Sequence, residues 1–280
     1  MEGEDQEKGA VKRSVCFSES FCRKGMVLNM KPIIEVCVGG YEDCLSAALG
    51  GADRVELNAA LSVGGLTPGM AVLKRVKQET GLKVICMVRP RAAGFCYSAK
   101  EKELMFEEAE LLLQHGADGI AFGFLREDGS IEKESTAKMI DLVHQKGKEA
   151  VFHRAFDVCR DAYGSIELLI SLGADRILTS GGQAKAVDGK ELLRKLQKAY
   201  GDRIQLLAGS GVNDQNAREL VEYTGICQVH SSCKSYREDA TTMGENVSYA
   251  YLPAPYEQSY DVVDSEKVKK LVTSLTFNKL

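Results

Sequence analysis

A glycine-rich motif recurs along the chain at nearly constant spacing. Gly51-Ala52-Asp53, followed by a short apolar segment, returns as Gly116-Ala117-Asp118 and Gly173-Ala174-Asp175, and more faintly at Gly225. In each copy, glycine can end a helix in the left-handed conformation, after which a polar turn leads into a buried strand. Similar glycine-led segments lie between the copies, so the six intervals from Gly51 to Gly225 average 29 residues. A repeat of this length is typical of one strand followed by one helix.

The repeat predicts eight parallel strands. We expect them at residues 33–38, 54–57, 83–88, 119–122, 150–153, 176–179, 204–207 and 227–230, with the clearest helices at 100–115, 133–145, 189–200, 215–223 and 265–274. Eight such units favour an α/β protein with a (β/α)8 (TIM) barrel, a fold of about 250 residues, over a doubly wound open sheet. We predict a single barrel domain at residues 31–280. Residues 1–30 show no helical or strand period and are expected to be a mobile N-terminal extension.

The composition excludes several classes of function. The chain carries 36 Lys and Arg against 40 Asp and Glu, a net charge of −4, whereas nucleic-acid-binding surfaces are usually basic. No apolar run approaches the ~18 residues that a membrane span needs. The nine cysteines show no Cys-x-x-Cys spacing, and no apolar signal segment precedes the repeats. We therefore expect free thiols, a cytoplasmic location, and neither nucleic acid nor membrane as a partner.

The site of a (β/α)8 barrel is built at the carboxyl ends of its strands. Glu35, Glu56 and His153 lie on or at the ends of predicted strands, and Asp157 follows His153 by four residues. Carboxylates and imidazole are the groups that most often carry general acid–base catalysis, so these four residues are candidate catalytic residues. The alternative for the two glutamates is a structural network of ion pairs with arginines of the barrel, because a buried charge needs a partner. The alternative for His153 is a hydrogen-bonded core histidine.

A second group of residues suggests a small anionic ligand, phosphorylated or sugar-like. Short Gly/Ser loops after strands allow backbone N–H groups to approach an anion, although tight turns alone also use such sequences. Arginine can clamp an anion with two parallel hydrogen bonds. The candidate ligand-binding residues are Arg89, Arg91, Ser180, Gly181, Gly209, Ser210, Gly211, His230 and Ser231.

The segment after the eighth predicted strand, residues 231–264, is long and holds five of the ten tyrosines. Aromatic loops of this length are usually functional or form interfaces. We expect a lid over the site or a contact between subunits.

Several runs of sequence resemble the CutC family, named for copper homeostasis. They lie, in order, at residues 34–38, 50–57, 64–68, 87–91, 152–157 and 178–181. The resemblance implies a cytoplasmic barrel, often a homo-oligomer, that binds copper as Cu(I) through thiols. Cys37 matches one ligand position that the resemblance implies. The second thiol position is Asn58 in this chain, and an amide is a poor ligand for Cu(I).

Two functions therefore compete. The resemblance implies a copper homeostasis protein that binds Cu(I). The alternative is a TIM-barrel enzyme that acts on a small anionic substrate by Glu/His acid–base chemistry, with a hard divalent metal bound by Glu56, His153 and Asp157 as a variant. A third hypothesis is a binding module whose pocket has no catalytic activity.

Overall fold

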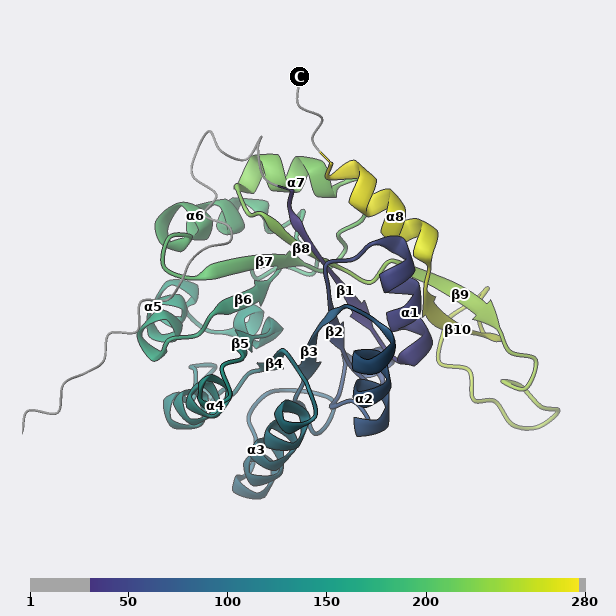
Figure 1. Ribbon diagram of the computed structural model, residues 1–280, viewed down its shortest axis with the longest axis horizontal. Helices are drawn as coiled ribbons and strands as arrows, with labels where there is room; N and C mark the ends of the chain where they lie inside the picture. Colours follow the sequence, from purple (N-terminus) through teal and green to yellow (C-terminus); the bar gives the residue numbers. More distant parts are fainter. Residues whose placement is uncertain (1–30, 277–280) are drawn as a thin grey trace, which may run out of the picture.

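Eight parallel strands close into a barrel in sequence order, surrounded by helices (Figure 1). The computed structural model describes residues 31–276. The barrel closes because β1 pairs with both β2 and β8. The strands are β1 Ile33–Val38, β2 Arg54–Leu57, β3 Lys83–Met87, β4 Gly119–Phe122, β5 Glu149–Phe152, β6 Arg176–Thr179, β7 Gln205–Gly209 and β8 Gln228–Ser231. The predicted single-domain (β/α)8 barrel is confirmed, while the extension expected at 1–30 lies outside the described residues.

The helices alternate with the strands. They are α1 Tyr41–Gly50, α2 Met70–Glu79, α3 Ala99–Gln114, α4 Lys133–Gln145, α5 Ala162–Leu172, α6 Lys190–Tyr200, α7 Ala217–Thr224 and α8 Ser265–Ser274, with 3-10 turns η2 Leu61–Val63 and η3 Arg154–Val158. Predicted boundaries shift by at most two residues. The helix expected from 215 begins later, at Ala217, because the side chains of Asn213 and Asn216 bond the backbone of the preceding turn.

The recurring Gly-Ala-Asp motif ties neighbouring strands together at the amino-terminal end of the barrel. Gly51 and Gly173 end their helices with φ values of 86° and 85°, as the motif predicts. Each aspartate carboxylate then accepts a hydrogen bond from the backbone N–H near the start of the preceding strand. The pairs are Ile34 to Asp53 at 2.9 Å, Val84 to Asp118 at 2.9 Å and Ala150 to Asp175 at 2.7 Å. The repeated aspartate therefore supplies a hydrogen bond between neighbouring strands of the barrel. These bonds lie at the amino-terminal ends of the strands, opposite to the carboxyl ends where a site is expected.

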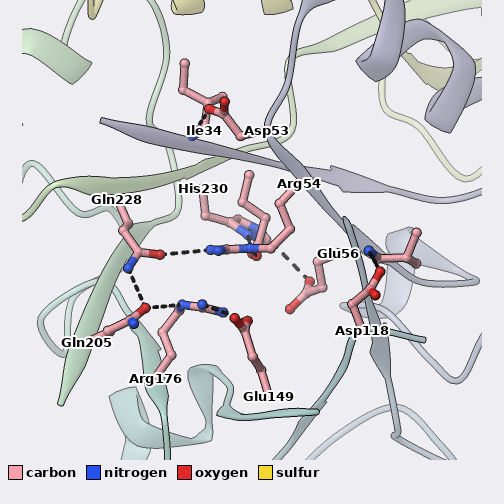
Figure 2. A network of polar contacts seen from close by, with 12 residues as sticks. Ile34, Asp53, Arg54, Glu56, Asp118, Glu149, Arg176, Gln205, Gln228 and His230 are labelled. Carbon is pink, nitrogen blue, oxygen red and sulfur yellow. Dashed lines mark hydrogen bonds and ion pairs between the residues drawn. The ribbon is translucent and has the colours of Figure 1, made fainter. Parts of the chain in front are cut away.

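The interior of the barrel has an apolar half and a polar half. Ile85, Met87, Ala121 and Val151, on β3 to β5, form a small apolar cluster. The other strands project charged and amide side chains inward, and these form a continuous chain of contacts (Figure 2). Branched apolar residues usually fill such barrels, so the polar half is a distinctive feature of this chain.

The tyrosine-rich segment forms an arm beside the barrel. β9 (Lys234–Glu238) and β10 (Ser259–Val263) pair antiparallel, and the segment between them extends away from the barrel in Figure 1. Arg237 bonds Glu42 at 3.0 Å and the N–H of Val263 bonds Asp43 at 2.8 Å, which fixes the arm against α1. Tyr249 is 80% exposed, so the outer part of the segment does not cover the barrel.

The cysteines that the structure describes follow the prediction with one exception. Among the described residues, free thiols occur at Cys37, Cys44, Cys86, Cys96, Cys159 and Cys233. Cys227 is disulfide-bonded, so the prediction of free thiols is wrong for this residue. No helix within residues 31–276 has the length and apolar character needed to cross a membrane.

Candidate functional site

A pocket of about 300 Å³ opens at the carboxyl ends of the strands. Its walls combine one thiol, several charged groups and an apolar surface. The lining residues are Cys37, Glu56, Asn58, Leu61, Gly64, Met87, Arg89, Phe95, His153, Arg154, Leu178, Ser210, Gly211, His230, Ser232 and Lys234. Seven of the candidate residues from the sequence therefore share one cavity: Cys37, Glu56, Arg89, His153, Ser210, Gly211 and His230.

Glu35 lies below this pocket, in the interior polar network. Its carboxylate forms an ion pair with Arg54 and accepts a hydrogen bond from Nδ1 of His230 at 2.8 Å. Burial by itself would raise the pKa of Glu35, but Arg54 and His230 outweigh it and hold the pKa well below its usual range. Glu35 is therefore an ionised partner of two cations, which is the structural alternative that the sequence left open.

The network continues from Arg54 across the barrel (Figure 2). Nη2 of Arg54 donates to Gln228 at 2.9 Å, Gln228 donates to Gln205 at 2.7 Å, and Gln205 accepts from Arg176 at 3.2 Å. Arg176 completes the chain with an ion pair to Glu149 at 2.8 Å. Four members of this network, Arg54, Arg176, Gln205 and Gln228, were not among the residues predicted from the sequence. The signal was present for two of them, because Arg54 lies two residues before Glu56 and Gln228 two before His230, each on the same strand face as that candidate residue.

His230 joins the network to the pocket. Its Nδ1 contacts Glu35, which leaves Nε2 facing Glu56 at 4.0 Å. Burial would lower the pKa of His230, but hydrogen bonds to Cys37 and Glu35 and the charge of Glu56 raise it well above its ordinary value. Burial raises the pKa of Glu56, opposed by His230 and reinforced by the charge of Glu35. Without a further ligand, His230 is thus an imidazolium between two carboxyl groups.

Cys37, Glu56 and His230 form a cluster of potential metal ligands. One donor atom from each residue lies within 4.8 Å of the others. Asn58 completes the surroundings, since its Nδ2 lies 3.1 Å from the carboxylate of Glu56 and 3.6 Å from Sγ of Cys37. Burial raises the pKa of the Cys37 thiol. Within residues 31–276 this is the group of three such side chains that converges, and it differs from the set Glu56, His153 and Asp157 that the sequence suggested.

His153 stands on another wall of the pocket, at the end of β5. Its Nδ1 accepts a hydrogen bond from the N–H of Ala155 at 3.1 Å and so caps η3. Nε2 is buried without a hydrogen-bond partner. Burial and the positive charge of Arg89 lower the pKa of His153 to about 3, so the ring is neutral at physiological pH. The ring of Phe95 packs against it, with 4.9 Å between centroids.

Asp157 does not line the pocket. Because η3 turns the chain after His153, its carboxylate points to the loop after β6, where it accepts from Thr179 at 2.6 Å and from Ser180 N and Oγ at 3.0 and 2.8 Å. Gly182 N–H and Arg154 bond the same carboxylate. Asp157 thus organises this loop, and its oxygens are occupied by these donors.

The remaining candidates also lie outside the pocket lining. Arg91 forms an ion pair with Glu101 at 2.5 Å and donates to loop carbonyls, since the chain leaves the barrel after Pro90. Ser180 and Gly181 belong to the loop held by Asp157. Ser231 donates to the carbonyl of Val212 at 2.6 Å, and Gly209 packs against Leu178 and His230. Of the two arginines that were predicted to hold an anion, Arg89 alone lines the pocket.

The fold and this pocket define a (β/α)8 barrel protein with a thiol-, imidazole- and carboxylate-lined cavity at the strand ends. A model of the CutC family matches residues 32–235, and the chain belongs to this family. A CutC family protein from Treponema denticola is 42% identical over 86% of this chain and 98% of its own length. The human copper homeostasis protein cutC homolog is 37% identical, over 85% and 87% respectively. The crystal structure of a CutC protein from Streptococcus agalactiae superimposes with a TM-score of 0.68 at 30% identity, covering 72% of this chain and 98% of that one.

Proposed function

We propose that this chain serves copper homeostasis by binding one copper ion, as Cu(I), between Cys37 and His230. The observation that carries the proposal is the convergence of Cys37, Glu56 and His230 within 4.8 Å at the base of the pocket. The names of the relatives support copper as the metal.

The donor chemistry fits this ion. Thiolate is the ligand type that selects Cu(I), and imidazole also suits copper. A histidine ligand usually donates its other ring N–H to a carboxylate, which fixes its orientation, and Glu35 supplies this partner at 2.8 Å. Glu56 adds negative charge beside the ion, while Asn58 donates toward Cys37 and Glu56 in place of a second thiolate.

Binding at these residues exchanges protons for the metal. Cys37 must lose its thiol proton and His230 must become neutral, since only these forms are ligands. The structure raises the pKa of both groups, so the metal competes with two tightly held protons. We expect affinity for Cu(I) to rise with pH across the neutral range. Reducing conditions maintain the Cu(I) state and the free thiol of Cys37, so we propose a cytoplasmic location, in which the disulfide at Cys227 is an exception.

An anaerobic titration with Cu(I) against a chromophoric chelator tests the proposal. We expect one equivalent to bind tightly to the wild-type protein, and the variant Cys37→Ser to lose it. Cys96→Ser is the matched control, because Cys96 is an exposed free thiol outside the pocket. Asn58→Cys should restore a two-thiolate site and raise the affinity by at least about tenfold. Unchanged binding in Cys37→Ser would overturn the assignment.

The alternative of acid–base catalysis on an anionic substrate is not favoured, because the names of the relatives refer to copper and to no reaction. The binding of a small anion is a separate question from catalysis, and the arginine and histidine that line the pocket provide an argument for it.

A further inference from the structure

We propose that the same pocket binds a small organic carboxylate, held by Arg89 and by Nε2–H of His153. This site lies across the barrel from the proposed metal ligands, since Cys37 is on β1 and His153 ends β5. It is a second binding function, independent of copper.

Arg89 is a buried charge without a counterion. Its guanidinium is 6% exposed and donates to the carbonyls of Val63 at 3.1 Å and Gly65 at 3.0 Å, and to Ala93. No carboxylate among residues 31–276 forms an ion pair with it. Arg54 and Arg176, the other two arginines buried in the described part of the chain, each pair with a glutamate. A buried charge is costly unless it is compensated, so Arg89 favours an anion in the cavity that it lines.

His153 lines the same cavity and carries an N–H donor without a partner. Because Nδ1 accepts the hydrogen bond from Ala155, the neutral ring carries its proton on Nε2. That N–H group is buried and has no partner, which is rare for a polar group in a folded protein. The complementary group on a ligand is an acceptor.

A carboxylate meets both requirements. It carries one negative charge and has two oxygens that only accept hydrogen bonds. The rest of such a ligand would meet an apolar surface formed by Leu61, Met87, Phe95 and Leu178. Phe95 contacts both donors, lying 4.9 Å from the ring of His153 and 5.2 Å from the guanidinium carbon of Arg89. A cavity of about 300 Å³ has room for a short organic acid. Arg154 and Lys234 also line the cavity, but each pairs with a carboxylate, that of Asp157 and that of Asp261, so Arg89 is left to balance the anion.

NMR of the full chain labelled at histidine tests the site with acetate and propionate as probes. We expect a saturable shift of the His153 ring signals with both acids, and tighter binding of propionate, because its extra carbon meets the apolar wall. Acetamide, which has the shape of acetate without the charge, should bind at least about tenfold more weakly.

Three substitutions, at His153 and at Arg89, separate the role of each donor in binding from its role in the fold. His153→Asn keeps an acceptor for the N–H of Ala155 but removes Nε2–H, and we expect it to weaken propionate binding about tenfold, followed through the backbone amides of the pocket. Arg89→Gln should do the same, whereas Arg89→Lys, which keeps the charge, should retain most of the affinity.

The copper site provides the control. Cys37→Ser should bind propionate as the wild type does, and His153→Asn should bind Cu(I) as the wild type does, so the two proposals fail separately. The carboxylate site is overturned if wild-type protein shows no saturable shift with either acid, or if acetamide binds as well as acetate.

Discussion

Replacement of Glu35 by glutamine removes one charge from the centre of the interior network and keeps the size of the side chain. Glu35 is 2% exposed and Arg54 is 3% exposed, and the two form an ion pair. Glu35→Gln therefore leaves the guanidinium of Arg54 buried without a carboxylate, although Gln228 still accepts one of its hydrogen bonds. Removal of one partner of a buried ion pair costs about 3–5 kcal/mol of unfolding free energy.

Thermal unfolding at pH 7 measures this cost. For a domain of this size, each kcal/mol lowers the Tm by about 2–4 °C, so we expect a decrease of about 6–20 °C. The matched control is Glu167→Gln, which removes the same charge from an ion pair with Arg203 at 2.9 Å whose side chains are about half exposed. Exposed pairs contribute about 0–1 kcal/mol. If Glu35→Gln lowers the Tm no more than Glu167→Gln, the network is not a major source of stability.

The pH dependence gives a second, independent check. Burial raises the pKa of Glu35, but Arg54 and His230 dominate and the pKa lies below the ordinary value of 4.5. A carboxylate of this kind stabilises the fold above its unfolded-state pKa, and the stabilisation is lost as the pH falls toward the folded-state pKa. The difference in Tm between the wild type and Glu35→Gln should therefore be complete at pH 7 and shrink below about pH 4.5. A difference in Tm between the two proteins that stays constant as the pH falls below about 4.5 would contradict this assignment of Glu35.

Three further predictions concern the frame of the barrel and its arm. Asp175→Ala leaves the N–H of Ala150 without its acceptor and should lower the unfolding free energy in urea by about 1–3 kcal/mol. Gly119→Ala places a methyl group 2.5 Å from the carbonyl oxygen of Glu149 and should cost about 1–3 kcal/mol, whereas Gly40→Ala, which meets no atom within 4 Å, should change stability by less than about 0.5 kcal/mol. We propose that copies of the chain associate through the arm: sedimentation should show a homo-oligomer that Tyr249→Ser weakens, and a monomeric wild type would refute this.

The strands were predictable because the Gly-Ala-Asp motif combines two local requirements. Gly51 and Gly173 adopt positive φ where a helix ends, and the aspartate two residues later bonds the N–H of the preceding strand. Both residues therefore mark the position at which the next strand begins. The arm was not predictable in the same way. Within residues 31–276, β9 and β10 pair only with each other. Their side chains are mixed and partly exposed, so neither strand has the apolar run of a barrel strand.

Every candidate residue that lines the pocket lies on a strand or within two residues of its carboxyl end, so the prediction held close to the strands. Cys37, Glu56 and His230 project from strands, and their positions along those strands bring them to the same end of the barrel. Arg91 and Asp157 lie beyond the strands, in segments whose direction depends on local contacts. The spacing of four residues between His153 and Asp157 therefore predicted a shared site that η3 prevents.

His230 is the residue through which the structural network and the pocket act on each other. Its Nδ1 is bound by a carboxylate that is itself fixed by Arg54, and its Nε2 is turned toward Glu56. A change at Arg54 or Glu35, neither of which lines the pocket, therefore alters both the direction of the His230 ring and its affinity for a proton. The affinity of any ligand that displaces this proton from His230 therefore depends on Glu35 and Arg54 as well as on the residues that line the pocket. The polar half of the barrel interior thus sets the chemistry of the cavity above it, in addition to filling the barrel.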